Sequence, residues 1–212
     1  INIDLMYGFN NQSINELDKD IDFFLHLNIP HISIYSLILE EHTKLFINKY
    51  TSLDEEVESN MYYHIIKRLE ENGFNHYEIS NFSKTGFESK HNLCYWNNDN
   101  YYGFGLGASG YIDNIRYTNT RSINNYLKGN YILDSELLTE KDKMVYEMIC
   151  GLRKIEGISK KKFFTKFDKD IKKVFDIESL IKKGYLIEQE DKLFIPKDKL
   201  YISNQILMNF LD

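Results

Sequence analysis

Residues 31–39 read "HISIYSLIL", a continuous run of β-branched and other apolar residues that follows Pro30. Such a run is typical of a strand that is buried on both faces, as in the sheets of α/β proteins. Upstream, residues 1–8 read "INIDLMYG", a shorter and mainly apolar run that ends in glycine and predicts a neighbouring strand. The fold then depends on what connects and follows these two strands.

Helical patterns flank the 31–39 strand on both sides. Ser13 and Glu16 have the spacing of a capping box, and Asp54 can cap a second helix that ends at Gly73. The apolar stripes of the two helices are Ile14, Leu17, Ile21, Phe24 and Leu25 in the first, and Val57, Met61, Ile65 and Leu69 in the second. Because two such stripes can cover one face of a sheet, they support an α/β fold.

A third strand is predicted from "FNHYEISNF" at residues 74–82. The alternation of strands and helices indicates a parallel sheet with right-handed crossovers. In such sheets ligands bind at the carboxyl ends of the strands. The residues that the pattern places there are Tyr7, Gly8, Ser36, Glu78 and Asn81.

The second half of the chain changes to a helical pattern from Thr139. Shorter helices are predicted from Ser159 and over 176–183, then two strands around an acidic turn in 185–195, and a final helix from about Asp198. Helices followed by a hairpin and a helix make a winged-helix-like module. Its boundary is predicted between residues 125 and 138.

Charge and cysteine content exclude some classes of protein. With 26 basic and 32 acidic residues the net charge is -6, which argues against a nucleic-acid coat over the whole surface. Winged helices often bind DNA, but acidic residues dilute the lysines of this module, so we predict no nucleic-acid partner. Two cysteines make no disulfide framework, and no apolar run approaches the roughly 20 residues of a membrane span. A cytoplasmic protein is expected.

The stretch "KHNLCYWNNDNYYGFGLGASG", residues 90–110, is the richest in chemistry. His91 is a suitable axial ligand for haem iron, and Tyr95 and Trp96 could wall a porphyrin. A histidine beside aromatics is also commonly a hydrogen-bonded structural residue. Cys94 lacks the companions that a zinc site needs, so we interpret it as packing. The glycines fit a turn against a flat ligand better than a dinucleotide-binding loop.

Other catalytic arrangements have weaker support. The serines lack a nucleophile-elbow sequence, which argues against a hydrolase triad. Asp4 is placed near the end of a barrel-type strand, where a carboxylate commonly accepts hydrogen bonds from sugar hydroxyls. A capped or solvated Asp4 is the alternative.

Taken together and in this order, five stretches resemble the HemN/HemW group of radical S-adenosylmethionine proteins. These are "INIDLMYG", "HISIYSL", "HYEISNF", "HNLCYW" and "YYGFGLGA", and the helical part is similar to the group's small C-terminal domain. The His91-Asn92-x-x-Tyr95-Trp96 pattern resembles the signature of HemW-type haem chaperones more than that of true coproporphyrinogen dehydrogenases.

The resemblance implies a fold and a set of binding residues. The fold would be α/β, the second half of a partial (β/α) radical S-adenosylmethionine barrel over 1–130, followed by a mostly helical winged-helix-like domain over 131–212. By the family pattern Asp4 and Ser36 would contact S-adenosylmethionine. His91, Asn92, Tyr95 and Trp96 would form a haem site, with His91 as the candidate iron ligand.

The sequence departs from the family pattern at several positions, which limits the residue roles that the resemblance implies. Residues 8–13 read "GFNNQS" where Gly-Leu-Pro-x-Gln-Thr is usual, and residues 40–43 read "EEHT" where Glu-Pro-Gly-Thr is usual. Ser109 stands where a histidine is common. The C-x3-C-x2-C motif that holds a [4Fe-4S] cluster in the family is absent, and Cys94 and Cys150 cannot replace it.

The chain begins inside a predicted strand without an initiator Met, so we expect a fragment that begins downstream of that motif. Such a fragment would hold neither the cluster nor tightly bound cofactor. Its first strand would lie at an open sheet edge, available for self-association.

Three functions remain open at this point. The resemblance favours a haem chaperone that passes haem or a porphyrin to an acceptor protein at the membrane. The alternatives are an oxygen-independent coproporphyrinogen III oxidase, which decarboxylates coproporphyrinogen III to protoporphyrinogen IX, and a nucleic-acid-binding winged helix.

Overall fold

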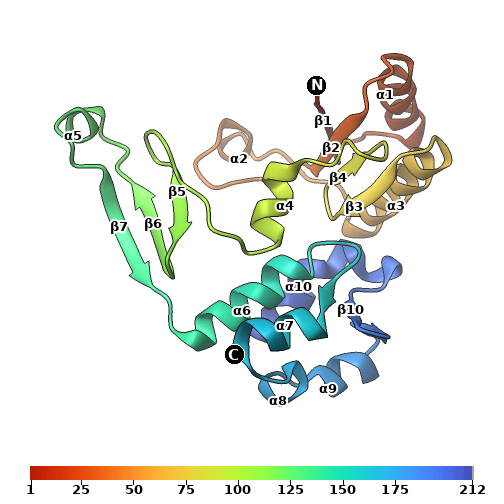
Figure 1. Ribbon diagram of the computed structural model, residues 1–212. Coiled ribbons are helices and arrows are strands. Elements are labelled where there is room, and N and C mark those ends of the chain that lie inside the picture. Colours follow the sequence, from red (N-terminus) through yellow and green to blue (C-terminus); the bar gives the residue numbers. More distant parts are fainter. Residues whose placement is uncertain (212) are drawn as a thin grey trace. The chain divides into compact units, whose positions relative to one another are not determined.

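The computed structural model describes residues 1–211 (Figure 1). The chain forms two compact units, Ile1–Glu88 and Ser89–Asp212, which are described separately. The family domains expected over 1–130 and 131–212 stay a prediction. Within the described residues no helix has both the length and the apolar character to cross a membrane.

The first unit contains a four-stranded sheet in the order β1-β2-β4-β3. Its strands are β1 Ile3–Tyr7, β2 His31–Ser36, β3 Asn75–Glu78 and β4 Asn81–Ser83. β1 and β2 are parallel, as predicted, and Asp4 lies opposite Ser33. β1 is an edge strand of this sheet, which agrees with the predicted sheet edge.

The prediction of one parallel strand over residues 74–82 is wrong. β3 and β4 form an antiparallel hairpin, and β4 runs antiparallel to β2. The chain turns at Ile79 and Ser80, whose carbonyl groups accept hydrogen bonds from Tyr62 Oη (2.9 Å) and Ile34 N (2.7 Å). Both carbonyl groups have hydrogen-bond donors at the turn, so the buried chain can change direction there. The apolar pattern of the sequence does not reveal this turn and predicts one continuous strand.

Two long helices cover the sheet, α1 Ile14–His26 and α3 Glu55–Glu71, and a short helix α2 Lys44–Ile47 lies between them in the chain. Both long helices start at the predicted caps, Ser13 with its capping box and Asp54. Gly73 has φ +80°, the left-handed backbone that commonly ends a helix. The fully buried side chains include Leu17, Ile21, Ile32, Ile34, Met61, Ile65, Leu69 and Phe82.

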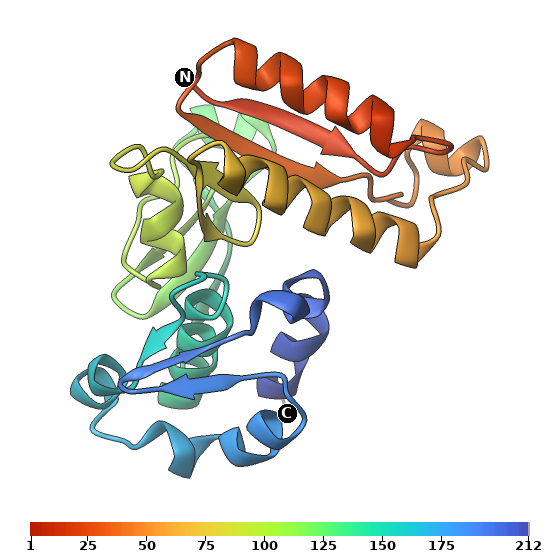
Figure 2. The ribbon, with the colours of Figure 1, turned by 90° about the vertical axis from the view of Figure 1, so that its right-hand side faces the viewer.

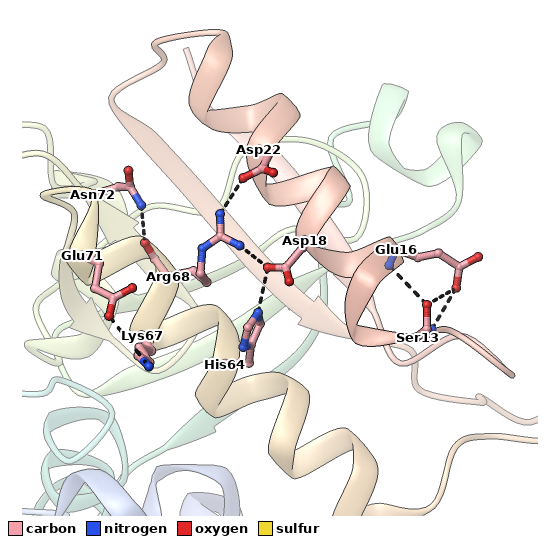
Figure 3. Close-up of polar contacts among 9 residues, drawn as sticks. All are labelled: Ser13, Glu16, Asp18, Asp22, His64, Lys67, Arg68, Glu71 and Asn72. Carbon is pink, nitrogen blue, oxygen red and sulfur yellow. Dashed lines mark hydrogen bonds and ion pairs between the residues drawn. The ribbon is translucent and has the colours of Figure 1, made fainter.

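Ion pairs join α1 to α3, which run side by side (Figures 2 and 3). The Arg68 guanidinium donates to Asp18 and, at 2.5 Å, to Asp22. His64 Nε2 lies 2.8 Å from the same Asp18 carboxylate. The hydrogen bond from His64, together with the Arg68 charge, holds the pKa of Asp18 below its usual range.

The second unit begins with the short helix α4 Lys90–Trp96 and a three-stranded antiparallel sheet. The sheet strands are β5 Ser109–Ile112, β6 Ile115–Asn119 and β7 Ile132–Leu137, with α5 Ile123–Leu127 between the last two. Asp113 and Asn114 connect β5 to β6, and both have positive φ, which suits a tight hairpin turn.

The rest of this unit is the predicted winged-helix-like arrangement. Its helices are α6 Glu140–Gly151, α7 Lys160–Phe167, α8 Ile171–Val174, α9 Ile177–Lys182 and α10 Ser203–Leu207, with 3-10 turns Lys197–Ile202 and Met208–Phe210. β8 Ile158–Ser159, β10 Lys192–Phe194 and β9 Ile187–Gln189 form one antiparallel sheet. Thr139 caps α6 with the predicted capping box. The expected mixed α/β class with a helical C-terminal part is therefore confirmed.

Replacing Arg68 by Met should weaken the α1–α3 contact. Because partly exposed ion pairs contribute modestly, we expect the free energy of unfolding to fall by about 1 kcal/mol at neutral pH. The folded-state pKa of Asp18 is lowered, so this stabilisation is present above the unfolded value of about 3.9 and is lost as pH falls through the folded value. Urea unfolding of both proteins at several pH values measures the difference.

Lys67→Met is the matched control, because Lys67 is the neighbour of Arg68 and pairs with Glu71, 3.9 Å away on its own helix. It should change stability little. Equal losses for Lys67→Met and Arg68→Met, or a difference independent of pH, would contradict this account of the α1–α3 contact.

Candidate functional site

Helix α4 carries all four predicted haem-site residues, on two of its faces. It begins at Ser89, whose side chain accepts a hydrogen bond from Asn92 N. His91 and Tyr95 are four residues apart and share one face, while Asn92 and Trp96 share another. The structure thus brings His91 together with Tyr95, and it places Trp96 elsewhere on the helix.

His91 is exposed and stands against an aromatic wall. Its ring lies 4.7 Å from the Tyr95 ring at an angle of 80°, and Tyr95 Oη lies 3.0 Å from His91 Nε2. Tyr95 in turn packs edge-on against Tyr101, with ring centroids 4.4 Å apart. An accessible imidazole beside two phenol rings that pack edge-on has the chemistry of a haem ligand with an aromatic wall.

Trp96 fits the role of a scaffold better than that of a wall beside His91. Its indole Nε1 is buried and has no hydrogen-bond partner within the described residues, and the Arg153 guanidinium lies 5.4 Å from its ring centroid. This contact with the segment after α6 anchors the end of α4. Asn92, half-buried, contributes its backbone N–H to the Ser89 cap.

The two cysteines do not form a metal site. Cys94 Sγ is 3.7 Å from the carbonyl oxygen of Asn100, and burial raises the pKa of both the Cys94 and Cys150 thiols. No group of three or more potential ligands among His, Cys, Asp and Glu comes together in residues 1–211. These residues therefore do not fit a [4Fe-4S] cluster, which needs several thiolates.

Asn98, which the sequence analysis overlooked, fixes the carboxyl end of α4. It is buried, has φ +52°, and donates from Nδ2 to Glu147 Oε2 on α6 at 3.3 Å. Its Oδ1 accepts from Arg116 Nη2 at 3.1 Å. Next to it, Asn97 Oδ1 accepts from Lys154 Nζ at 2.7 Å. Asparagine commonly ends a helix with a left-handed backbone. This is the feature of the sequence that could have pointed to Asn98.

Arg116 completes this network from β6. Its guanidinium lies 3.8 Å from the Tyr146 ring centroid and 4.7 Å from that of Tyr111. Lys166 also pairs with Glu147, at 2.7 Å. The helix that presents His91 is thus tied through side chains to both the β5–β7 sheet and α6.

The glycine-rich loop after Tyr101 is held from within the protein. Asn119 Nδ2 donates to the carbonyl groups of Gly103 and Gly105, each at 3.0 Å, and Gly103 N donates to Tyr117 Oη at 2.9 Å. A Cβ at Gly103 would come within 2.4 Å of the Ser109 carbonyl. These glycines permit close backbone packing, which differs from a loop whose N–H groups are open to a phosphate.

The first unit holds the residues predicted to contact S-adenosylmethionine. Asp4 is exposed in the first half of β1, where Asn2 Nδ2 donates to its carboxylate at 2.6 Å, so the expectation that it lies near the strand end is wrong. Ser36 does end β2, half-buried and opposite Tyr7. The two residues lie at different positions along the strands, because Asp4 is opposite Ser33 and Ser36 is opposite Tyr7.

Of the other residues predicted at the strand ends, Glu78 and Asn81 lie together. Asn81 Nδ2 donates to the carboxylate of the buried Glu78. Burial raises the pKa of the neighbouring Tyr62, with smaller contributions from Tyr7, Tyr63 and Glu78. Glu78 and Asn81 meet because they belong to the β3–β4 hairpin, and not because each ends a parallel strand.

Some lysines of the winged-helix-like part pair with acidic residues. Lys172 contacts Glu178 at 3.0 Å and Glu188 at 2.7 Å, and Lys160 also pairs with Glu188. Paired lysines offer less charge to phosphates, and the absence of a nucleic-acid partner stays a prediction.

Comparison with known proteins places the chain among relatives. Residues 138–198 match the HemN C-terminal domain family. The "Heme chaperone HemW" of Lactococcus lactis is 38% identical over 100% of this chain, and that of Bacillus subtilis is 35% identical over 100%. The chain covers 58% and 59% of their lengths, so it spans little more than half of these relatives.

One solved structure shares the fold over 99% of this chain and 54% of its own, with a TM-score of 0.80 and 16% identity. It is described as "Coproporphyrinogen III oxidase (HemN) from Escherichia coli is a Radical SAM enzyme". The resemblance read from the sequence is confirmed by these findings together.

Replacing Asn98 by Gly tests the network at the end of α4. Glycine keeps the left-handed backbone but removes the hydrogen bonds to Glu147 and Arg116, so we expect unfolding to be easier by about 2 kcal/mol. Asn114→Gly is the matched control, since Asn114 has φ +70° in an exposed turn. Chemical unfolding should find Asn114→Gly near wild type, and equal effects of the two substitutions would contradict the role of the Asn98 side chain.

Proposed function

We propose that this chain, a relative of the HemN and HemW proteins, binds haem and passes it to an acceptor protein as a haem chaperone. The observation that carries the proposal is the exposed His91 imidazole against Tyr95 and Tyr101. The relatives named as haem chaperones support it, because they align with the whole chain.

Three residues of α4 and Asn98, which follows the helix, have distinct parts in this proposal. His91 supplies the iron ligand, and Tyr95, within hydrogen-bond distance of its Nε2, orients the ring before haem arrives. Trp96 and Asn98 hold the helix, through Arg153 and through Glu147 and Arg116. An exposed ligand suits a protein that must release its haem, because an acceptor can reach the iron without unfolding the site.

The proposal assigns cofactors to the full-length protein and not to this chain alone. There Asp4 and Ser36 would contact S-adenosylmethionine, whose radical chemistry also requires a [4Fe-4S] cluster that the described residues do not fit. A cytoplasmic protein that meets its acceptor at the membrane is part of the proposal as well. Two cysteines without a disulfide agree with a reducing compartment.

A coproporphyrinogen III oxidase is the second candidate, and the fold likeness to HemN favours it. A structural likeness at 16% sequence identity is evidence for the fold alone. The relatives with higher sequence identity are named haem chaperones. An assay of coproporphyrinogen III turnover beside a haem titration separates the two. Turnover without haem binding would overturn the chaperone proposal.

His91→Ala should weaken haem binding and alter the Soret band, because packing cannot replace an iron–nitrogen bond. His26→Ala is the matched control, since His26 is also exposed but ends α1 in the first unit. Absorbance titration with haemin measures both variants, and thermal unfolding shows whether they remain folded. An unchanged affinity and spectrum for His91→Ala would refute ligation by this residue.

A further inference from the structure

A cavity in the first unit has ligand-binding character. It lies between the end of β2 and the start of α3, has a volume of about 680 Å³, and is lined by Leu39, His42, Phe46, Ile47, Lys49, Tyr50, Thr51 and Ser52. Phe46 and Ile47, 48% and 66% exposed, offer apolar surface at the pocket. We call this cavity the α2 pocket.

Two residues of the α2 pocket have a left-handed backbone. Lys49 (φ +53°) follows the carboxyl end of α2, where a left-handed residue commonly ends a helix. His42 (φ +67°) lies in the loop before the Thr43 cap, and histidine is among the residues that adopt this backbone more often than most. The loop conformation thus sets where both side chains leave the backbone.

His42 places an imidazole in the wall of the pocket. Its backbone has positive φ, so glycine can replace it without backbone strain.

The α2 pocket lies beside the carboxyl ends of the parallel strands. Tyr50 Oη accepts a hydrogen bond from Asn10 N at 2.7 Å, which joins the pocket to the loop after β1. Thr43 caps α2 by accepting from Phe46 N at 3.3 Å. The pocket is therefore built at the edge where α/β sheets bind ligands.

The lining combines the groups that a haem requires. Leu39, Phe46, Ile47 and Tyr50 offer apolar and aromatic surface, and no acidic residue lines the pocket. The Lys49 ammonium can pair with a carboxylate, and an imidazole can ligate iron. A flat apolar molecule that carries carboxylates and a metal matches this set.

We propose that the α2 pocket is a second haem-binding site, with His42 as iron ligand and Lys49 as partner of a propionate. The inference rests on the proposed haem-binding function but concerns residues of the first unit only. It gives this chain an imidazole for haem in each of its two units, with His91 in the other.

Haemin titration of the full chain tests this proposal. We expect His42→Gly to reduce bound haemin from about two equivalents to about one, since an axial ligand is lost. Its thermal stability should equal or exceed that of wild type, because glycine relieves the left-handed backbone. His42→Asn, which also tolerates positive φ, should lose the same equivalent, and His26→Asn should lose none.

The outcomes separate this inference from the proposed function. Wild-type stoichiometry and spectrum for His42→Gly would overturn the second site, while loss of binding in His91→Ala would still support the function at α4. Unchanged binding in His91→Ala with loss in His42→Gly would support the pocket and overturn ligation by His91. No haemin bound by wild type would overturn both.

Discussion

The side chain of Asn98 is the contact on which the presentation of His91 depends. Helix α4 has only seven residues, and an isolated helix of that length is not stable in water. Its geometry comes from its ends: the Ser89 cap at the start and, at the other end, Asn98 bonded to Glu147 and Arg116. The C-terminal helices thereby act on the exposed imidazole through hydrogen bonds, without touching it.

The first unit uses the same principle with different elements. The β1–β2 pair and the helices α1 and α3 form a rigid base, joined by Arg68 to Asp18 and Asp22. The short helix α2 carries exposed apolar residues, and His42, which has a left-handed backbone, lies in the loop just before its Thr43 cap. The histidine with ligand chemistry therefore lies on a short capped helix in one unit and next to one in the other.

The helices were largely predictable from the sequence, because caps and apolar periodicity are local signals. The predicted helix ends at Ser13, Asp54, Gly73 and Thr139 are confirmed. The hairpin at Ile79 was not predictable, because its turn carbonyls accept hydrogen bonds from Tyr62 and Ile34, which belong to other elements. The contacts of Asn98 also arise from residues distant in sequence. The residue types in 90–110 made His91 a candidate ligand, and the family pattern favoured it over a structural histidine.

Resonance Raman spectroscopy of the ferrous haem complex tests the central claim, that an imidazole of this chain ligates haem iron. The account predicts an iron–histidine stretching band that shifts when histidine is labelled with ¹⁵N. A spectrum typical of thiolate or tyrosinate ligation would contradict it and direct attention to Cys94 or Tyr95 instead. A ferrous complex without any axial protein ligand would contradict the account altogether.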